Sequence, residues 1–277
     1  MRRSSFILLA LTSSEANRGK WCAVIAAGGS LDSQLAREFG SASKATVEFE
    51  GRPSVAFVLD ACLEAGLSTT LVADESVRAC ISDYSDRVAF ANPGETNIRS
   101  ALHGLETSGA TGPVLYLPCD LPLVRCDFIR HFIEATELRM HASGGEWFSA
   151  ALSRKEEVER LLPSAEFRYI RLREGRFAAG GMFAASANGL RRAFGALETA
   201  SSRRKSILRL VTRLGALNLV RYLLGRASIS DAERAVGRAL GGDVFVVADC
   251  HPFTAMDFDT VEDLQYLRQR FSSLRLE

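Results

Sequence analysis

The sequence has little net charge and no long apolar run, and each absence argues against a class of protein. The 277 residues carry a formal net charge of +1, so the overall balance gives no reason to expect nucleic-acid binding. No apolar run approaches the roughly 18 residues that span a bilayer. The composition, 47% hydrophobic and 24% charged, argues against a disordered or collagen-like chain. We therefore expect a globular protein.

Cysteine pairs and lysines are also scarce. The six cysteines include no Cys-x-x-Cys pair, and four of them lie in apolar stretches typical of buried strands or helices. We therefore expect a reduced, cytoplasmic protein. Among 34 basic residues only four are lysines, namely Lys20, Lys44, Lys155 and Lys205. Where arginine is so strongly preferred, a lysine suggests a need for its compact ammonium group.

Residues 1–19 are expected to form a flexible leader ahead of one functional domain over residues 20–277. The leader begins with Met-Arg-Arg and a six-residue apolar run from Phe6 to Leu11. Secretion signals usually have an apolar region of roughly 7–15 residues and a small-x-small cleavage site. A cleaved signal is therefore the less favoured interpretation.

Strands and helices alternate along the first half of the chain. Continuous apolar segments over Trp21–Ala27 and Pro113–Pro118 predict strands that are buried on both faces. A helix is predicted from Pro53 to Gly66, because proline favours the first turn of a helix and glycine its end. Further predicted elements are strands over 69–73 and 87–91 and a helix over 97–106. This spacing predicts an α/β fold with a mostly parallel central sheet flanked by helices.

The pattern changes after Trp147. The sequence then predicts a strand to Leu152, a charged helix over 155–162, paired strands over 168–183 and a strand over 243–248. A final helix is predicted to begin at Thr260, because Thr260 and Asp263 form the Thr-x-x-Asp capping pattern.

A basic segment interrupts this second half. Residues 191–226 contain nine basic residues and one acidic residue, Glu198, which gives a local charge of +8. The apolar residues Ile207, Leu210 and Leu214 share one helical face, so a basic amphipathic helix broken at Gly215 is predicted. We therefore expect residues 191–241 to form a helical basic insertion.

A glycine turn after the first predicted strand is a candidate phosphate-binding loop. It reads Ala26, Ala27, Gly28, Gly29 and Ser30. Two glycines at the end of a parallel strand allow the backbone to approach a phosphate closely, although a plain tight turn is an equal alternative. The turn matches neither G-x-G-x-x-G nor the P-loop pattern, which argues against a dinucleotide dehydrogenase and a P-loop kinase.

Lys44 is the second candidate for phosphate binding. It lies in a stretch rich in serine, glycine and alanine, for which no strong helix or strand is predicted. A solvated surface lysine is the alternative. The scarcity of lysine in this chain favours the phosphate interpretation.

Aspartates follow two predicted strands. Asp120, in Leu117-Pro-Cys-Asp-Leu-Pro122, stands at the carboxyl end of a buried strand, where ligands bind in open α/β sheets. It is a candidate Mg²⁺ ligand, with a turn or helix-cap role as the alternative. Alternation places Asp257 and Asp259 on the same side of an extended segment. Because Asp259 can cap the following helix instead, Asp257 is ranked above it.

These motifs resemble one known family, in its order and over about residues 20–270. They are the strand ending in Ala-Gly-Gly, Lys44 ahead of Gly51-Arg52-Pro53, the Leu-Pro-x-Asp-x-Pro strand end and the closing Asp-x-Asp-Thr-x-Glu-Asp-Leu. The chain is similar to the MobA-like nucleotidyltransferases, which include molybdenum cofactor guanylyltransferase. The resemblance implies a Rossmann-like GT-A fold that binds a nucleoside triphosphate with Mg²⁺ and transfers its nucleotidyl group to an acceptor.

The resemblance also implies residue roles. The glycine loop and Lys44 hold the triphosphate, Asp120 and Asp257 hold the metal, and Asn97 lies near the base or ribose; GTP and CTP are the favoured nucleotides. Two positions depart from the family's pattern. Many relatives carry Arg-Met-Gly after the glycine loop, where this chain has only Arg37. Gly180-Gly181 stands where Gly-Asn is expected.

The acceptor is expected to be a small phosphorylated, hydroxyl-bearing or lipid-like molecule. Its predicted contacts are Gly180, Gly181, Arg203, Arg204 and Lys205, because arginine suits phosphate. The basic segment can alternatively contact a membrane surface or a second subunit, or form a solvated face. No nucleic-acid partner is expected. Two other functions remain open: a GT-A glycosyltransferase that uses a nucleotide sugar, and a non-catalytic nucleotide-binding protein.

Overall fold

The structure is a computed structural model, and it describes residues 21–27, 31, 33–140, 143–201 and 226–276. Three predictions lie outside the described residues: the leader, the turn residues Gly28, Gly29 and Ser30, and the basic residues Arg203, Arg204 and Lys205 with their amphipathic helix.

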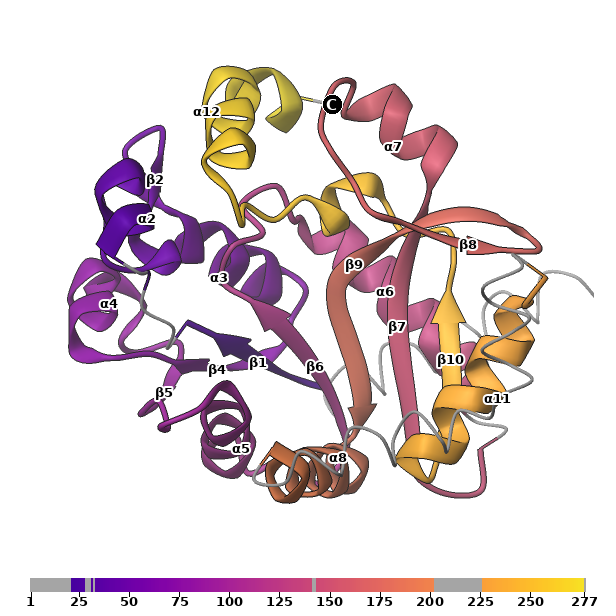
Figure 1. The fold of residues 1–277 in the computed structure, drawn as a ribbon. Coiled ribbons are helices and arrows are strands. Elements are labelled where there is room, and N and C mark those ends of the chain that lie inside the picture. The colour runs from indigo at the N-terminus through magenta and orange to yellow at the C-terminus, as the bar shows by residue number, and fades with distance from the viewer. Residues whose placement is uncertain (1–20, 28–30, 32, 141–142, 202–225, 277) are drawn as a thin grey trace, which may run out of the picture.

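One eight-stranded mixed sheet forms the centre of the molecule (Figure 1). Its path is β10-β7-β9-β6-β1-β4-β5, and β8 pairs with β9 off this path. The strands are β1 Cys22–Ala26, β4 Ser68–Val72, β5 Ala89–Ala91, β6 Pro113–Pro118, β7 Trp147–Arg154, β8 Tyr169–Leu172, β9 Gly175–Ser186 and β10 Asp243–Val247. A small hairpin pairs β2 Glu48–Phe49 with β3 Arg52–Pro53.

Most strand pairs are parallel, as the sequence predicts. The parallel neighbours are β1 with β4 and β6, β4 with β5, and β7 with β10. Only β9 runs against its neighbours β6, β7 and β8. The prediction of an α/β fold with a mostly parallel sheet is confirmed, with one antiparallel strand in its middle.

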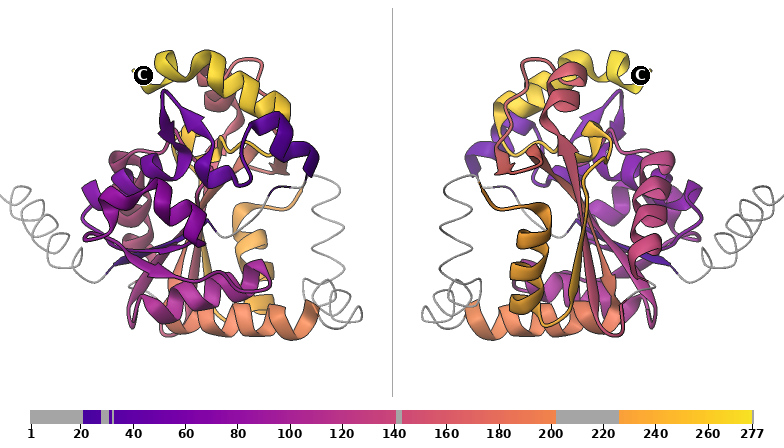
Figure 2. Two further views of the ribbon diagram at one scale, coloured as in Figure 1. Left: turned by 90° about the vertical axis from the view of Figure 1, so that its left-hand side faces the viewer. Right: turned by 90° about the vertical axis from the view of Figure 1, so that its right-hand side faces the viewer.

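Helices cover both faces of the sheet, as the two side views show (Figure 2). They are α2 Ser33–Phe39, α3 Ser54–Glu64, α4 Glu75–Cys80, α5 Asn97–Thr107, α6 Cys126–Met140, α7 Lys155–Leu161, α8 Ala187–Ser201, α11 Ile229–Leu240 and α12 Val261–Arg275. Three short 3-10 turns are η1 Lys44–Thr46, η2 Ser82–Tyr84 and η3 Pro252–Ala255. The helix at the start of the predicted basic insertion, α8, begins at Ala187, four residues earlier than predicted.

The stretch around Lys44 contains no strong helix or strand, as predicted, and has only the three-residue 3-10 turn η1. The helix α2, which ends at Phe39 just before this stretch, was not predicted. Phe39 at the end of α2 is 1% exposed, and its ring centroid lies 5.9 Å from that of Phe258. The helix is therefore ordered by packing against the distant C-terminal part of the chain, where local composition gives no signal.

Strand residues alternate between two cores. Ile25 and Leu115 belong to the core under α3 and α6, whereas Val24 and Val114 belong to the core under α5 and α8. Gly104 brings α5 close to the sheet, because a Cβ at this position would lie 2.5 Å from Val72 Cγ2. Successive residues of each strand thus pack on opposite faces of the sheet, as expected for a sheet that helices cover on both sides.

Strand β9 leaves β6 before β6 ends. Their pairing stops at Tyr116 and Phe183, and the register of β9 against β7 slips between Ala150 and Leu152. Gly180 and Gly181 lie in this irregular part of β9. A Cβ at Gly181 would lie 2.7 Å from Leu121 Cδ1, and one at Gly180 would lie 2.9 Å from Ala151 Cβ. Both glycines therefore allow close packing next to Asp120.

The outer edge of β10 is partly covered by α11. The Val246 backbone N–H donates a hydrogen bond to Glu233 Oε1 of α11 at 2.9 Å. The same carboxylate accepts a hydrogen bond from Arg139 at 2.7 Å. A side chain thus occupies a backbone donor that an edge strand would otherwise offer to another strand.

The cysteines have no disulfide partner, and Cys22, Cys62, Cys119 and Cys250 are buried, as predicted. A search of the described helices for one of sufficient length and apolarity to cross a membrane finds none.

Candidate active site

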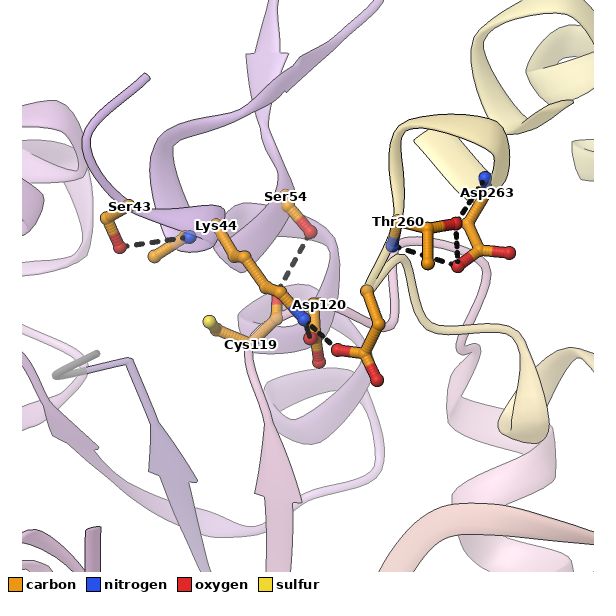
Figure 3. A network of polar contacts seen from close by, with 9 residues as sticks. Ser43, Lys44, Ser54, Cys119, Asp120, Thr260 and Asp263 are labelled. Atoms are coloured by element: carbon orange, nitrogen blue, oxygen red, sulfur yellow. Dashed lines mark hydrogen bonds and ion pairs between the residues drawn. The ribbon is translucent and has the colours of Figure 1, made fainter. Parts of the chain in front are cut away.

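Lys44 joins three segments that are distant in the sequence (Figure 3). It opens η1, and its Nζ donates a hydrogen bond to Asp120 Oδ2 at 2.7 Å. The same ammonium contacts Asp259 Oδ1. It also lies 5.8 Å from the centroid of the Phe258 ring. Lys44 is therefore a partly buried cation that is paired with two carboxylates, and not a solvated surface lysine.

Asp120 is fixed at the carboxyl end of β6 by bonds to the peptide before it. The Cys119 N–H donates to the Ala26 carbonyl at 3.1 Å, and Ser54 Oγ donates to the Cys119 carbonyl at 2.9 Å. Asp120 is only 7% exposed, and its Oδ1 is buried with no hydrogen-bond partner among the described residues. A buried carboxylate oxygen without a partner is costly and indicates a place for a ligand.

Asp257 and Asp259 project from the same side of the chain, as alternation predicts. Met256, just before Asp257, and Phe258, between the two aspartates, are buried in the core, whereas both aspartates are exposed. Phe258 packs against Phe49 with ring centroids 5.5 Å apart. The core thus holds this segment while its acidic side chains face the site.

Thr260 caps α12, and this removes the reason for ranking Asp259 second. The Thr260 side chain accepts from the Asp263 N–H, and the Asp263 side chain accepts from the Thr260 N–H, which completes the predicted capping box. Asp259 is not the cap and contacts Lys44 instead. The sequence contained a signal for this outcome, since the Thr-x-x-Asp pattern already assigned the cap to Thr260.

The charges of the site perturb one another. Burial alone would lower the pKa of Lys44, but the charges and hydrogen bonds of Asp120 and Asp259 outweigh it and raise this pKa. Loss of surrounding water, followed by the negative charges of Asp120 and Asp259, raises the pKa of Asp257 to about 6. The three carboxylates are therefore close enough to repel one another, and Lys44 offsets only part of that repulsion.

A cleft of about 730 Å³ adjoins the aspartates. Its lining includes Asp257 and Asp259, the loop over 164–168, Ala178 and Ala179 of β9 and the first turns of α12. Gly180 and Gly181, the predicted acceptor contacts, are the next residues along β9 but face close-packed atoms of Ala151 and Leu121. Their contact with an acceptor remains a prediction.

The predicted nucleotide-binding residues that the structure describes lie at the same edge of the sheet. Ala26 ends β1, and the Ala27 N–H donates to the Val72 carbonyl at 2.9 Å. Asn97 is exposed at the first position of α5, which Thr96 caps. Their contact with a nucleotide remains a prediction. Ser54 was missed because a serine after a proline looks like an ordinary helix start.

The carboxylates fit a magnesium ion. All of their donor atoms are oxygens, which hard cations prefer. Asp120 Oδ1 is buried and has no hydrogen-bond partner among the described residues. Within the described part of the chain, no group of three or more His, Cys, Asp or Glu residues is arranged as a ready metal site. In phosphate chemistry Mg²⁺ usually takes one or two carboxylates and completes its shell with water and substrate phosphates.

Among solved structures, a hypothetical transferase from Thermus thermophilus is 28% identical to this chain, with a TM-score of 0.73 and coverage of 88% of this chain and 99% of its own. A nucleotidyl transferase from Methanothermobacter thermautotrophicus is 17% identical, with a TM-score of 0.54 and coverage of 92% and 98%. CMP:2-keto-3-deoxy-manno-octonic acid synthetase, solved with CTP, is 13% identical, with a TM-score of 0.55 and coverage of 92% and 99%. The last two show a shared fold.

No curated protein sequence matches the chain. The family model of the MobA-like NTP transferase domain, however, matches residues 22–162. The match contains β1, Lys44 and Asp120 and covers half of the chain. The chain therefore belongs to the MobA-like NTP transferase family of nucleotidyltransferases.

Proposed function

We propose that the protein is a Mg²⁺-dependent nucleotidyltransferase that moves a nucleoside monophosphate group from a nucleoside triphosphate to an acceptor oxygen and releases pyrophosphate. The convergence of Lys44, Asp120 and Asp257 at the carboxyl edge of the sheet carries this proposal. Ligands of open α/β sheets bind at this edge. Family membership supports the use of a nucleoside triphosphate.

Lys44 is suited to hold phosphate while it stays in place. An ammonium group has three N–H donors, and Asp120 and Asp259 accept two of them. The third has no acceptor among the described residues and is free for a phosphate oxygen. Asp259 therefore positions Lys44, and Lys44 stabilises the negative charge that grows on the α-phosphate and on the leaving pyrophosphate.

Asp120 and Asp257 are the residues that would hold Mg²⁺. A Mg²⁺ ion held by these residues would supply positive charge that offsets part of the negative charge of the phosphates. The buried Oδ1 of Asp120 would gain the partner that it lacks. Asp257 is held on the cleft side by the buried neighbours Met256 and Phe258.

In the proposed reaction no residue of the protein forms a covalent bond to a substrate. An acceptor oxygen forms a bond to the α-phosphorus, the bond from that phosphorus to the bridging oxygen breaks, and pyrophosphate leaves with the electron pair. An alcohol acceptor passes its proton to water in this step, whereas a phosphate acceptor that is fully ionised has none to lose. Positioning and charge neutralisation therefore supply most of the catalysis, as in other phosphoryl-type transfers.

Pyrophosphate release tests the proposal. We expect the isosteric variant Asp120→Asn to release pyrophosphate at least about 10²-fold more slowly, because a lost charge contact of ~3 kcal/mol has this effect. Asp86→Asn, at an exposed aspartate of the same charge, is the matched control. Near-normal release from a folded Asp120→Asn protein would exclude this carboxylate from the mechanism. Release of nucleoside diphosphate would instead indicate a glycosyltransferase, and nucleotide binding without turnover would indicate a binding protein.

The nucleotide is proposed to be GTP or CTP. A fold relative solved with CTP supports the second. Thermal unfolding with GTP, CTP, ATP and UTP, each with Mg²⁺, identifies the preferred one, because a ligand that binds only the folded state raises the unfolding midpoint. Equal midpoints for all four would contradict a preference for either.

A further inference from the structure

The described lining of the cleft beside Asp257 contains none of the predicted nucleotide-binding residues. Figure 1 shows β1, β4 and α5 in the lower left part of the molecule and β8 at its right. The described residues that line the cleft come from the 164–168 loop, β9, the segment over 255–260 and α12. None comes from β1, η1 or α5. A nucleotide held by Lys44 would therefore face the cleft across Asp120 and Asp257.

The buried carboxylate of Asp120 marks the junction between these two sides. It is more than nine-tenths buried, and its Oδ1 lacks a partner among the described residues. Its Oδ2 accepts a hydrogen bond from the Lys44 ammonium, as Figure 3 shows. The same ammonium contacts Asp259, which itself lines the cleft. The reacting atoms of two substrates can therefore meet at Asp120, with one substrate on each side.

The charge of the cleft is strongly one-sided. Its described lining contains five carboxylates and one guanidinium, namely Glu166, Asp257, Asp259, Glu262, Asp263 and Arg168. Lys44 is paired with Asp259, and Asp263 is held in the capping box of α12. Glu166 and Glu262 are exposed, and no ion pair joins either of them to another described residue. The described lining of the cleft therefore carries a net negative charge.

The uncharged part of the lining is mostly apolar. Ala178 and Ala255 are buried in the wall, Phe167 and Met256 add larger apolar side chains, and the hydroxyl-bearing residues are Ser164, Thr260 and Tyr266. A negatively charged group close to Glu166 and Glu262 would be repelled by these carboxylates, whereas an ammonium would be attracted. At about 6 Å in a water-like medium, each such pair changes affinity about threefold.

We infer that this cleft is the acceptor site and that the acceptor is a small amino alcohol or the phosphate ester of one. Its reacting oxygen lies at Asp257, and its ammonium points toward Glu166 and Glu262. The oxygen bonds to the α-phosphorus as the bond to pyrophosphate breaks, and the ammonium stays protonated and takes no covalent part. The inference rests on the proposed function and adds to it the charge of the acceptor.

Two matched pairs of probes test the inference. Ethanolamine is compared with ethylene glycol, which has a hydroxyl in place of the amine, and phosphoethanolamine with glycerol 3-phosphate, which has a phosphate and no amine. Pyrophosphate release with the preferred nucleotide and Mg²⁺ gives kcat/KM for each. In at least one pair we expect the amine to be preferred about tenfold, from two charge pairs of about threefold each. Ethanolamine offers only an alcohol oxygen and phosphoethanolamine only phosphate oxygens, so the one of these two that reacts shows which oxygen is the acceptor.

Charge variants separate recognition from a structural effect. Glu166→Gln and Glu262→Gln should each raise KM for the amine probe about threefold with little change in kcat, and should leave the probe without an amine unaffected. Glu75→Gln, at an exposed glutamate of α4, should change neither. Added salt should weaken the preference for the amine, because exposed charges are screened.

Several results would overturn the inference. These are equal kcat/KM within both pairs, a preference for the anionic probe without an amine, an equal loss for both probes in the glutamine variants, or no reaction of any probe with a protein that binds its nucleotide. Failure of every nucleoside triphosphate to raise the unfolding midpoint with Mg²⁺ is a different result, because it would refute the proposed function itself.

Discussion

The variant Asp257→Asn is expected to make the metal-free protein more stable at neutral pH. Loss of surrounding water and the charges of Asp120 and Asp259 raise the pKa of Asp257 from 3.8 to about 6. The unfolded chain thus ionises this group near the ordinary value, and the folded protein does so about two pH units later. The unfolded state binds fewer protons between these values, so stability falls as the pH rises from about 4 to about 6.

The size of the effect follows from the shift in pKa. A displacement from 3.8 to about 6 corresponds to about 3 kcal/mol for a fully buried group. Asp257 is exposed on its cleft side, and water screens its repulsion, so we expect about 1 kcal/mol. For a chain of this size, 1 kcal/mol corresponds to a rise in Tm of roughly 2–4 °C.

Thermal unfolding in EDTA at about pH 7.5 and about pH 4.5 measures this gain, with Asp86→Asn as the control. The gain should be larger at the higher pH and clearly smaller at the lower one, where the folded wild type is mostly protonated at Asp257. With Mg²⁺ and nucleotide the order should reverse, because the wild type alone keeps both proposed metal ligands. An equal gain at both pH values, or a loss at pH 7.5, would refute the electrostatic reasoning.

Three further predictions concern the scaffold of the site. Gly104→Ala should lower the free energy of unfolding by about 1–3 kcal/mol, because its Cβ would lie 2.6 Å from Val24 Cγ1. The control is Gly195→Ala in α8, which should raise the free energy of unfolding by about 0.5–1 kcal/mol, because a Cβ there meets nothing within 4 Å. Equal effects of the two variants in urea denaturation would contradict the packing argument. Ser54→Ala should lower the free energy of unfolding by about 1 kcal/mol and lower kcat more than nucleotide affinity, because it removes the hydrogen bond to the Cys119 carbonyl. An unchanged kcat would show that Asp120 does not depend on this hydrogen bond. Burial, followed by the charge of Arg125, lowers the pKa of His251 to about 4, so the wild type should lose stability as the pH falls from about 6.5 to about 4. Over this pH range, the urea midpoint of His251→Asn should fall less than that of the wild type. Identical pH profiles of the two proteins would contradict this assignment.

The fold could be predicted well where local patterns decide the structure. Apolar runs identified β1 and β6, proline and glycine marked the ends of α3, and the capping box placed the start of α12. The direction of β9 could not be predicted, because a strand pattern carries no information about the orientation of its neighbours. The helix α2 was missed for a related reason, since its anchor is Phe258, which lies more than two hundred residues later.

The site was predictable residue by residue but not as an arrangement. Lys44 stood out because lysine is scarce, and Asp120 because it ends a buried strand. Their hydrogen bond and the contact of Lys44 with Asp259 depend on tertiary structure. The acidic character of the cleft was not predictable either, because Glu166 and Glu262 look like ordinary surface residues in the sequence and only the fold brings both to the same cleft.

The carboxylate of Glu233 has a consequence for how copies of this protein meet. Because it occupies the Val246 N–H, a neighbouring molecule that docked a strand along β10 would first have to break a charge-assisted hydrogen bond. Growth of the sheet from copy to copy is therefore disfavoured at this border, and with it one route to fibrous aggregation. A single acid on a helix protects the chain in a way that proline or lysine does in many other sheets.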